Sequence, residues 1–251
     1  KAIIRRLGAL KAMRQPLEQG WAECFSYSFP ERGHGLNGNV ALPSDIQAKK
    51  VRILDDTAAD SARILSSSIV SGTTPANSLW FGLDAGQESD DENRWLDQSA
   101  RIMFDNIHGS NFDAVSFECL IDEVASGQSV MFVTEGDAGG FQFEQWEFAD
   151  SVFYASKSGG PVDTIYREYT LTAEQAINEF GRDRVSDKVR EAVTDDPGKA
   201  FCFVYCIYPR GGDNVGPFAL NMPFAELIIE RDTLHVVREG GFNEFPCIVP
   251  R

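Results

Sequence analysis

The chain has 251 residues, 43% of them hydrophobic, and a formal net charge of -15 at pH 7. This length and apolar content allow a substantial core, in one large domain or two small ones, and they argue against a disordered chain. The negative charge argues against a general nucleic-acid-binding surface, because phosphate groups are bound by clustered Lys and Arg.

The charge is unevenly distributed along the chain. The first 52 residues carry nine Lys/Arg and four Asp/Glu, so that a basic N-terminal arm precedes an acidic body. The simplest interpretation of the arm is a solvated helix face. Its basic residues are Arg5, Arg6, Lys11 and Arg14.

Five scattered cysteines suit a reducing compartment better than a disulfide framework. Cys202 and Cys206 resemble a metal pair, but on a strand they would lie roughly 13 Å apart, too far to share one zinc. No apolar window reaches the roughly 18 residues of a membrane span, and no secretory leader is visible. Because the chain begins at Lys1 and ends in an extended Pro-bounded segment, we expect it to be part of a longer protein.

The pattern in residues 2–24 predicts a helix that Pro16 ends or kinks near Gln15. Residues 33–38 then match the dinucleotide fingerprint G-x-G-x-x-G, but Pro43 follows with no helical pattern between. The fingerprint needs a helix that opens toward the pyrophosphate, so we predict a loop here, with His34 inside it.

Residues 54–70 predict a helix that opens with two Asp residues and is rich in Ala and Ser, which allows close approach of a neighbouring helix. The short apolar segment 79–83 is typical of a core plug. The acidic cluster 89–92 is interpreted as the N-terminal cap of the next helix rather than as a carboxylate metal site.

The stretch from Arg94 to Glu135 gives the central part of the predicted fold. An amphipathic helix comes first, with its apolar face turned away from water, and Gly109 is expected to close it in a left-handed conformation. Ser110 or Asn111 is expected to cap a second helix, which ends at Gly127. The apolar stripe of that second helix comprises Phe117, Leu120, Ile121 and Val124. The apolar run 129–133 then indicates a buried strand, so the sequence predicts a helical hairpin packed on a sheet.

Strands dominate the remainder. Residues 141–148 change apolar phase, which predicts a one-residue bulge near Glu144 and Gln145. Hairpins are predicted for 152–155 with 164–170, and for 224–230 with 234–238, after which Gly240 and Gly241 release the chain. A strand is predicted at 200–208 and a loop at 211–217. Thr172 and Gln175 form a capping box that opens a short helix, and a second short helix begins near Asp187.

Helices precede strands, which is the order of an α+β fold with a mostly antiparallel sheet. We divide it into a mainly helical part, 1–135, and a β-rich part with short helices, 136–251. His34, His108 and His235 are the only candidates for a catalytic base; His108 lies at a helix end that favours positive charge, and none is near a nucleophile motif. The sequence therefore predicts no catalytic residues, no metal site and no cofactor.

Several segments resemble one protein family in the same order along the chain. The run Asp163-Thr164-Ile165-Tyr166-Arg167-Glu168-Tyr169-Thr170-Leu171-Thr172-Ala173-Glu174-Gln175-Ala176, closed by Phe180-Gly181, resembles the portal, or head-to-tail connector, proteins of short-tailed bacteriophages. So do Ser126–Val133, Tyr208–Arg210 and Gly240–Arg251. The resemblance covers most of the chain.

The resemblance implies the N-terminal wing portion of a portal subunit, with stem helices, clip and tunnel loop expected after residue 251. It implies a homo-oligomer, a dodecameric ring at one capsid vertex of the virion, assembled in the host cytoplasm. Double-stranded DNA would pass through its channel during packaging and ejection. Terminase, scaffold, major capsid and tail adaptor proteins would be partners, with no membrane involved. The basic residues Arg5, Arg6, Lys11 and Arg14 are then expected to contact a neighbouring subunit or a capsid protein.

A second interpretation stays open. The chain could be an intracellular α+β enzyme or ligand-binding domain whose pocket lies between the helical hairpin and the sheet. A pocket that brings Asp or Glu together with His would favour that interpretation.

Overall fold

The computed structural model describes residues 1–32, 47, 50–51, 53–86, 89–136, 139–148, 152–156, 159–211 and 219–250. The predicted loop 33–38 with His34 lies outside them, as does most of the predicted loop 211–217. The described residues have an α+β fold with two antiparallel sheets, as predicted. The chain divides into two compact units, the first built from 1–19 and 148–246 and the second mainly from 20–147 with the segment that begins at Cys247.

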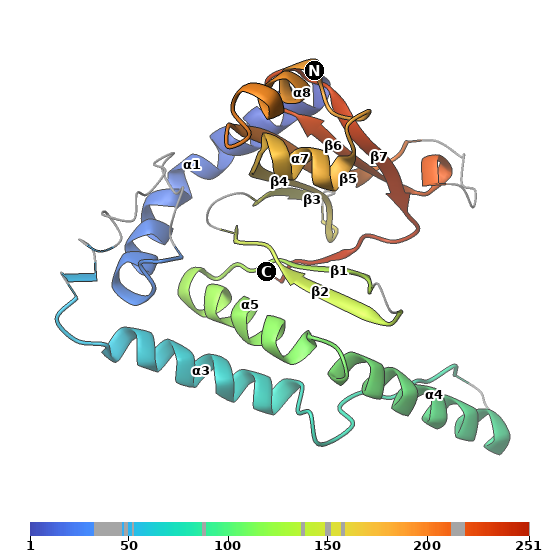
Figure 1. The fold of residues 1–251 in the computed structure, drawn as a ribbon. Coiled ribbons are helices and arrows are strands. Elements are labelled where there is room, and N and C mark those ends of the chain that lie inside the picture. The colour runs from blue at the N-terminus through green and yellow to red at the C-terminus, as the bar shows by residue number, and fades with distance from the viewer. Residues whose placement is uncertain are drawn as a thin grey trace. The chain divides into compact units, whose positions relative to one another are not determined.

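The first unit is built on a five-stranded antiparallel sheet of order β3-β4-β5-β6-β7 (Figure 1). Its elements are β3 (Val152–Ser156), β4 (Val162–Thr172), α7 (Ala173–Phe180), α8 (Asp187–Asp195), β5 (Ala200–Pro209), the 3-10 turn η2 (Ala219–Asn221), β6 (Phe224–Glu230) and β7 (Val236–Phe242). Helix α1 (Ala2–Ser28) contributes its part up to Gln19. The predicted hairpins β3-β4 and β6-β7 are both confirmed.

Helices cover both faces of this sheet. On one face, α7 and α8 pack on alternate residues of β5, among them Phe201 and Phe203. On the other, Leu7 of α1 packs on the intervening residues Val204 and Cys206. The alternation follows from the two-residue period of a strand, which turns successive side chains to opposite faces.

Of the two outcomes predicted for Pro16, an end or a kink, the end is wrong, because helix α1 continues through Pro16 to Ser28. Proline has no amide hydrogen to donate to the helix backbone. A proline at this position would therefore lower the stability of an isolated helix. Leu7 and Phe25, on either side of it, are both fully buried, and this burial offsets the missing bond. Tertiary packing therefore overrides a local helix breaker.

The prediction that Gly240 releases the chain is wrong, because β7 continues through it to Phe242. Gly240 pairs with Glu226 of β6. A Cβ atom at Gly240 would overlap the Glu226 carboxylate, whose Oε1 accepts a hydrogen bond of 2.9 Å from the Tyr205 hydroxyl. The glycine thus makes room for a buried acid inside a strand.

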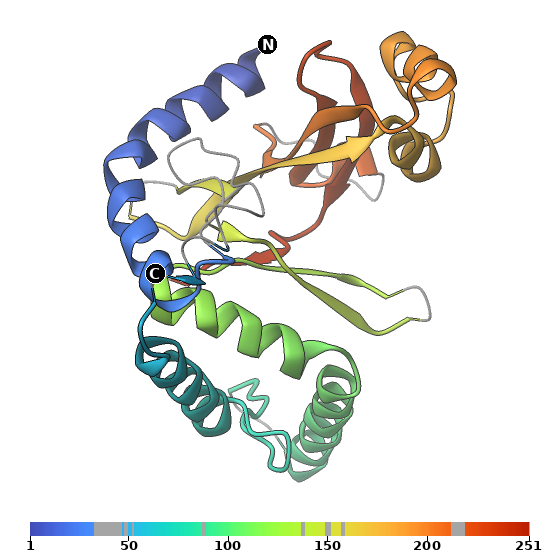
Figure 2. The ribbon, with the colours of Figure 1, turned by 60° about the vertical axis from the view of Figure 1, so that its left-hand side comes forward.

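The second unit contains α3 (Thr57–Thr73), α4 (Asp90–His108), α5 (Phe112–Ser126), β1 (Met131–Glu135), β2 (Phe141–Gln145) and β8 (Cys247–Ile248). The strands form a sheet of order β2-β1-β8, and α5 packs on it while α3 runs beside α5 (Figures 1 and 2). Ala62 and Ser66 of α3 are buried, as expected for a helix whose small residues allow close approach.

The residues of α5 that pack on the sheet are not the ones that the sequence predicted. Cys119 packs with Met131 and Phe143, and of the predicted stripe only Ile121 is buried. The difference arises because α5 has neighbours on two sides, the sheet and α3, so its pattern is not that of a helix with one buried face. Gly127 ends the helix with φ 73°, as predicted.

The predicted bulge in β2 is absent. The β1-β2 register runs without a shift to the pair Met131 and Gln145. The Trp146 amide then donates a 3.0 Å hydrogen bond to the Val130 carbonyl, and the Trp146 ring stacks on Phe132. The alternation of apolar residues therefore shifts after Gln145 because β2 ends at that residue.

Helix α4 begins at the predicted cap, since Ser89 and Glu92 form a capping box. Gly109 at its end is right-handed, with φ −74°, and not left-handed as predicted. Part of the apolar face of α4 is exposed, notably Trp95 and Ile102. The predicted core plug at 79–83 is wrong as well, because Leu79, Trp80 and Leu83 are exposed.

Candidate functional site

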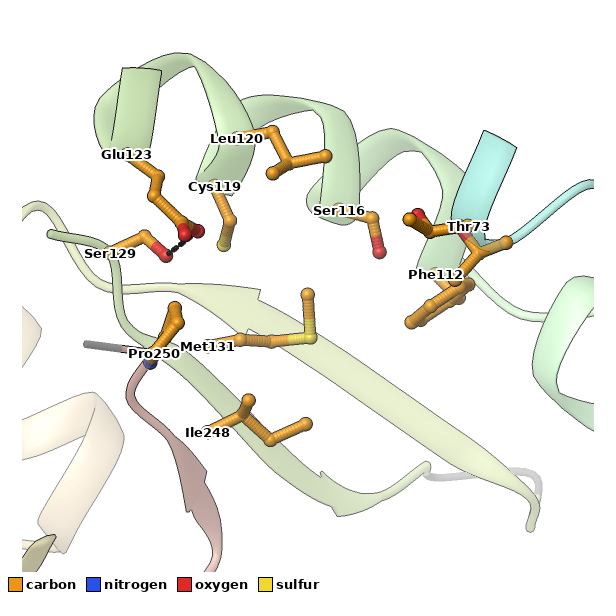
Figure 3. Close-up of a pocket in the computed structure, with 11 residues that line it drawn as sticks. Thr73, Phe112, Ser116, Cys119, Leu120, Glu123, Ser129, Met131, Ile248 and Pro250 are labelled. Atoms are coloured by element: carbon orange, nitrogen blue, oxygen red, sulfur yellow. Dashed lines mark hydrogen bonds between the residues drawn. The ribbon is translucent and has the colours of Figure 1, made fainter. Parts of the chain in front are cut away.

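An apolar groove of about 210 Å³ lies within the second unit, between α5 and the sheet (Figure 3). Its lining residues come from the end of α3, from α5, from β1 and from the chain around β8, and they are Thr73, Thr74, Phe112, Ser116, Cys119, Leu120, Glu123, Ser129, Met131, Ile248 and Pro250. This is the location that the second interpretation assigned to a pocket. The sequence did not identify the residues that line it, because they come from segments far apart in the chain.

Five side chains with a hydroxyl or carboxylate group line the groove, namely those of Thr73, Thr74, Ser116, Glu123 and Ser129. The Ser129 hydroxyl donates a 3.2 Å hydrogen bond to the Glu123 carboxylate at one end. Ser116 is 7% exposed, and its Oγ has no hydrogen-bond partner within the described part of the chain. Figure 3 shows the Ser116 hydroxyl directed into the groove. A buried hydroxyl without a partner carries a desolvation cost that a ligand atom could remove.

The groove does not resemble a catalytic centre. Its thiol, Cys119, has its pKa raised to about 12 by burial, with Asp122 and Glu123 contributing, so the thiolate nucleophile is suppressed. Glu123 is its carboxylate, and no histidine occurs among the lining residues within the described part of the chain. The arrangement favours the burial of an apolar side chain over acid–base chemistry.

Asn111 holds the start of α5 on the sheet. Its Nδ2 donates to the Phe143 carbonyl over 2.7 Å, and the Phe143 amide donates to its Oδ1 over 2.9 Å. The side-chain amide therefore pairs with β2 as a strand backbone would. The sequence suggested Ser110 or Asn111 as a helix cap; the Ser110 hydroxyl accepts from the Phe112 amide over 3.2 Å, whereas Asn111 makes no cap bond.

A buried carboxylate fixes the other side of α5. Asp122 is 3% exposed and accepts from Arg32, at 2.9 Å, and from the Gln145 side-chain amide. Burial raises the pKa of Asp122, while the Arg32 guanidinium opposes that shift. These contacts tie the segment after α1 to α5 and β2 and position one wall of the groove.

The basic residues of α1 are mostly used within their own chain. Arg14 is 8% exposed, donates to the Phe148 and Val152 carbonyls over 3.0 and 2.7 Å, and pairs with Glu18. The prediction that Arg14 contacts another protein is therefore wrong, because the residue is buried. The guanidinium fork suits this position, since it donates several hydrogen bonds at once.

Two more of the four basic residues also have internal partners. Lys11 pairs with Glu168 of β4, and Arg6 donates to the Thr164 hydroxyl over 3.3 Å. Arg5 is exposed. The sequence could not reveal these contacts, because each partner lies more than a hundred residues away.

The remaining sequence candidates do not converge on a site. His235 Nε2 lies 2.9 Å from the Arg184 carbonyl in the first unit. Burial raises the pKa of Cys206 to about 12, and burial also raises that of Cys202. Within the described residues, no group of three or more His, Cys, Asp or Glu could hold a metal ion.

None of the helices within the described ranges combines the length and apolar character needed to cross a bilayer.

A family model described as bacteriophage head to tail connecting protein matches residues 1–251. The portal protein of Salmonella phage epsilon15 is 28% identical over 265 aligned residues, which cover 99% of this chain and 46% of that protein. A probable portal protein of Bordetella phage BPP-1 is 24% identical over 259 residues, covering 100% of this chain and 46% of that protein. The chain thus spans less than half the length of the curated relatives it matches.

Proposed function

The chain belongs to the bacteriophage head to tail connecting proteins, and from this premise we propose that it is the wing portion of a portal subunit. The observation that carries the proposal is a match along all 251 residues to the family, together with two relatives named as portal proteins. Residues 1–135 and 136–251 are proposed as the helical and β-rich parts of the wing. The subunits form a dodecameric ring at one vertex of the capsid.

The ring surrounds a channel for double-stranded DNA during packaging and ejection and provides the attachment site between head and tail. The net negative charge of the chain supports free passage of DNA through the channel rather than tight binding. An acidic channel wall repels the DNA phosphates, which have the same sign of charge. Terminase, scaffold, major capsid and tail adaptor proteins are the proposed partners. The protein is proposed to be assembled in the host cytoplasm and to reside in the virion.

The proposed role is structural, without enzymatic activity and without a cofactor. The groove supports this role, because its lining pairs a carboxylate with a thiol of raised pKa and with apolar side chains. The second interpretation, an enzyme or ligand-binding domain, would be favoured by a pocket that brings Asp or Glu together with His. The lining residues do not include that pair within the part of the chain that the structure describes.

The native mass of the full-length protein tests the proposal. We expect native mass spectrometry or light scattering to give a dodecamer, because a ring follows from repeated head-to-tail contacts that close. A full-length protein that remains monomeric at all accessible concentrations contradicts the proposal.

DNA binding provides a second test. We expect the chain 1–251 to bind duplex DNA no more tightly than roughly 10⁻⁴ to 10⁻⁶ M at physiological salt, the range of non-specific contacts. Fluorescence anisotropy measures this affinity. Nanomolar binding that is lost in an Arg5→Ala, Arg6→Ala variant identifies α1 as a DNA-binding element and contradicts free passage.

A further inference from the structure

Helix α4 carries an apolar ridge on its exposed side. Trp95 is 64% exposed and Ile102 is 62% exposed. Residues seven positions apart lie on the same side of a helix, so the two side chains form one stripe. The Trp95 indole has no hydrogen-bond or ring-stacking partner among the residues that the structure describes. The capping box of Ser89 and Glu92 fixes the start of the helix one and a half turns before Trp95.

The groove between α5 and the sheet fits an indole in size. An apolar cavity of about 150 Å³ holds one benzene ring. The groove, at about 210 Å³, offers the additional volume that a fused second ring needs. Met131 and Ile248 supply apolar surface along its floor (Figure 3).

The groove also fits an indole in polarity. An indole has one polar atom, Nε1, which donates a hydrogen bond and cannot accept one. Ser116 Oγ is buried, points toward the groove and has no partner in the described part of the chain, so it becomes an acceptor once the Ser116 side chain turns to an inserted donor. A hydrogen bond from an indole would remove the cost of this unsatisfied hydroxyl.

Charges around the two surfaces are complementary. Arg94 precedes Trp95 and Arg101 precedes Ile102, so the two guanidinium groups flank the ridge on one side. The Arg94 side chain is 81% exposed, and its ion pair with Asp91 spans 4.0 Å, the outer limit for such a contact. Glu123 lies on the wall of the groove. Tryptophan and arginine are both enriched among the residues that contribute most of the binding energy of protein interfaces.

We propose that Trp95 of one copy inserts into the α5–sheet groove of a second copy of this chain, with its Nε1 donating to Ser116 Oγ. The proposal rests on the proposed function, because it assigns residues to a contact between ring subunits. Ridge and groove are different surfaces of the same unit, so the contact is head-to-tail. Such contacts repeat from copy to copy and give a ring when the rotation closes.

Sedimentation velocity of the chain 1–251 tests the contact with two complementary variants. Trp95→Ala removes the ridge and keeps the groove, whereas Ile248→Lys keeps the ridge and places a charge in the groove opposite Arg94 and Arg101. Trp95 and Ile248 are exposed, at 64% and 54%, so both variants should fold, which far-UV circular dichroism verifies. Ile64→Ala is the matched control, because Ile64 is 66% exposed on α3 and belongs to neither surface.

We expect each of the two variants to weaken self-association at least roughly 30-fold, the effect of removing an interface hot spot. Ser116→Ala should weaken it roughly 2- to 10-fold, the range for one hydrogen bond. Ile64→Ala should associate as the wild type does. A mixture of Trp95→Ala with Ile248→Lys should restore a one-to-one dimer and nothing larger, because only one ridge and one groove remain intact.

Two results overturn this contact: a wild-type chain that stays monomeric across the accessible concentrations, or a Trp95→Ala variant that associates like the wild type. The same substitution in the full-length protein separates this failure from failure of the proposed function. A full-length Trp95→Ala ring with unchanged stability refutes the Trp95 contact and leaves the portal assignment intact. A wild-type full-length protein that forms no ring refutes the portal assignment itself.

Discussion

Trp80 Nε1 donates a hydrogen bond to His108 Nε2 over 3.0 Å. Since an indole nitrogen can only donate, His108 Nε2 is the acceptor, and the ring proton lies on Nδ1. That nitrogen is 2.8 Å from Asp113 Oδ1, while the rings of Phe104 and Phe112 flank the imidazole. His108 thus links the segment before α4 to the start of α5 through both of its ring nitrogens.

Replacement of His108 by alanine should destabilise the second unit by about 1 to 3 kcal/mol, because two side-chain hydrogen bonds lose their common partner. Urea unfolding measures the change. Trp80→Phe, which removes the single indole donor, should cost about 0.5 to 1.5 kcal/mol. The double variant should cost less than the sum of the two, since the residues are in direct contact. Strict additivity would show that the bond does not contribute.

Ile121→Ala should cost roughly 2 to 5 kcal/mol, because Ile121 is 4% exposed and its truncation leaves a cavity beside α5. Leu120→Ala removes a similar volume at the wall of the groove, where solvent already has access, and should cost clearly less. Chemical denaturation of the two variants under identical conditions compares them. Equal losses would place Leu120 in the core, as the sequence alone suggested.

Arg14→Lys should destabilise the first unit by about 1 to 3 kcal/mol although the charge is kept. A lysine ammonium cannot reproduce the guanidinium fork that bonds two carbonyls of the β3 region and pairs with Glu18. Arg5→Ala, at an exposed position of the same helix, should change stability by no more than about 0.5 kcal/mol. Thermal unfolding of the two variants distinguishes an internal role of Arg14 from a role in binding.

The native protein should show one rapidly reacting thiol toward a thiol reagent at pH 8, namely the exposed Cys24. Burial raises the pKa of Cys119 and of Cys206 from 9.0 to about 12, and burial also raises the pKa of Cys247. An acid whose pKa is higher in the folded state keeps its proton there while the unfolded chain loses it. Stability should therefore fall as the pH rises from 9 toward 12. Rapid reaction of several thiols before unfolding would contradict this burial.

The local signals in the sequence were reliable because each concerns groups within a few residues of one another. Ser89 with Glu92 and Thr172 with Gln175 form the predicted capping boxes, and Gly127 ends α5 in a left-handed conformation. Hairpins were predicted for the same reason, since a turn and its flanking alternation lie in one short segment. These features were sufficient for the α+β class, and the resemblance of several segments was sufficient for the family.

The tertiary structure decided which side chains are inside. Pro16 is accommodated in α1 because residues on both sides of it are buried, Arg14 is buried by carbonyls more than 130 residues away, and Asn111 pairs with a strand that follows its own helix. The helical periodicity of a sequence identifies an apolar face but not the segment that packs on it. The exposed ridge at Trp95 and the groove lined by Ser116 could therefore be identified only from the tertiary structure. Burial is a property of contacts between distant segments, and a local pattern of residues does not determine which segments meet.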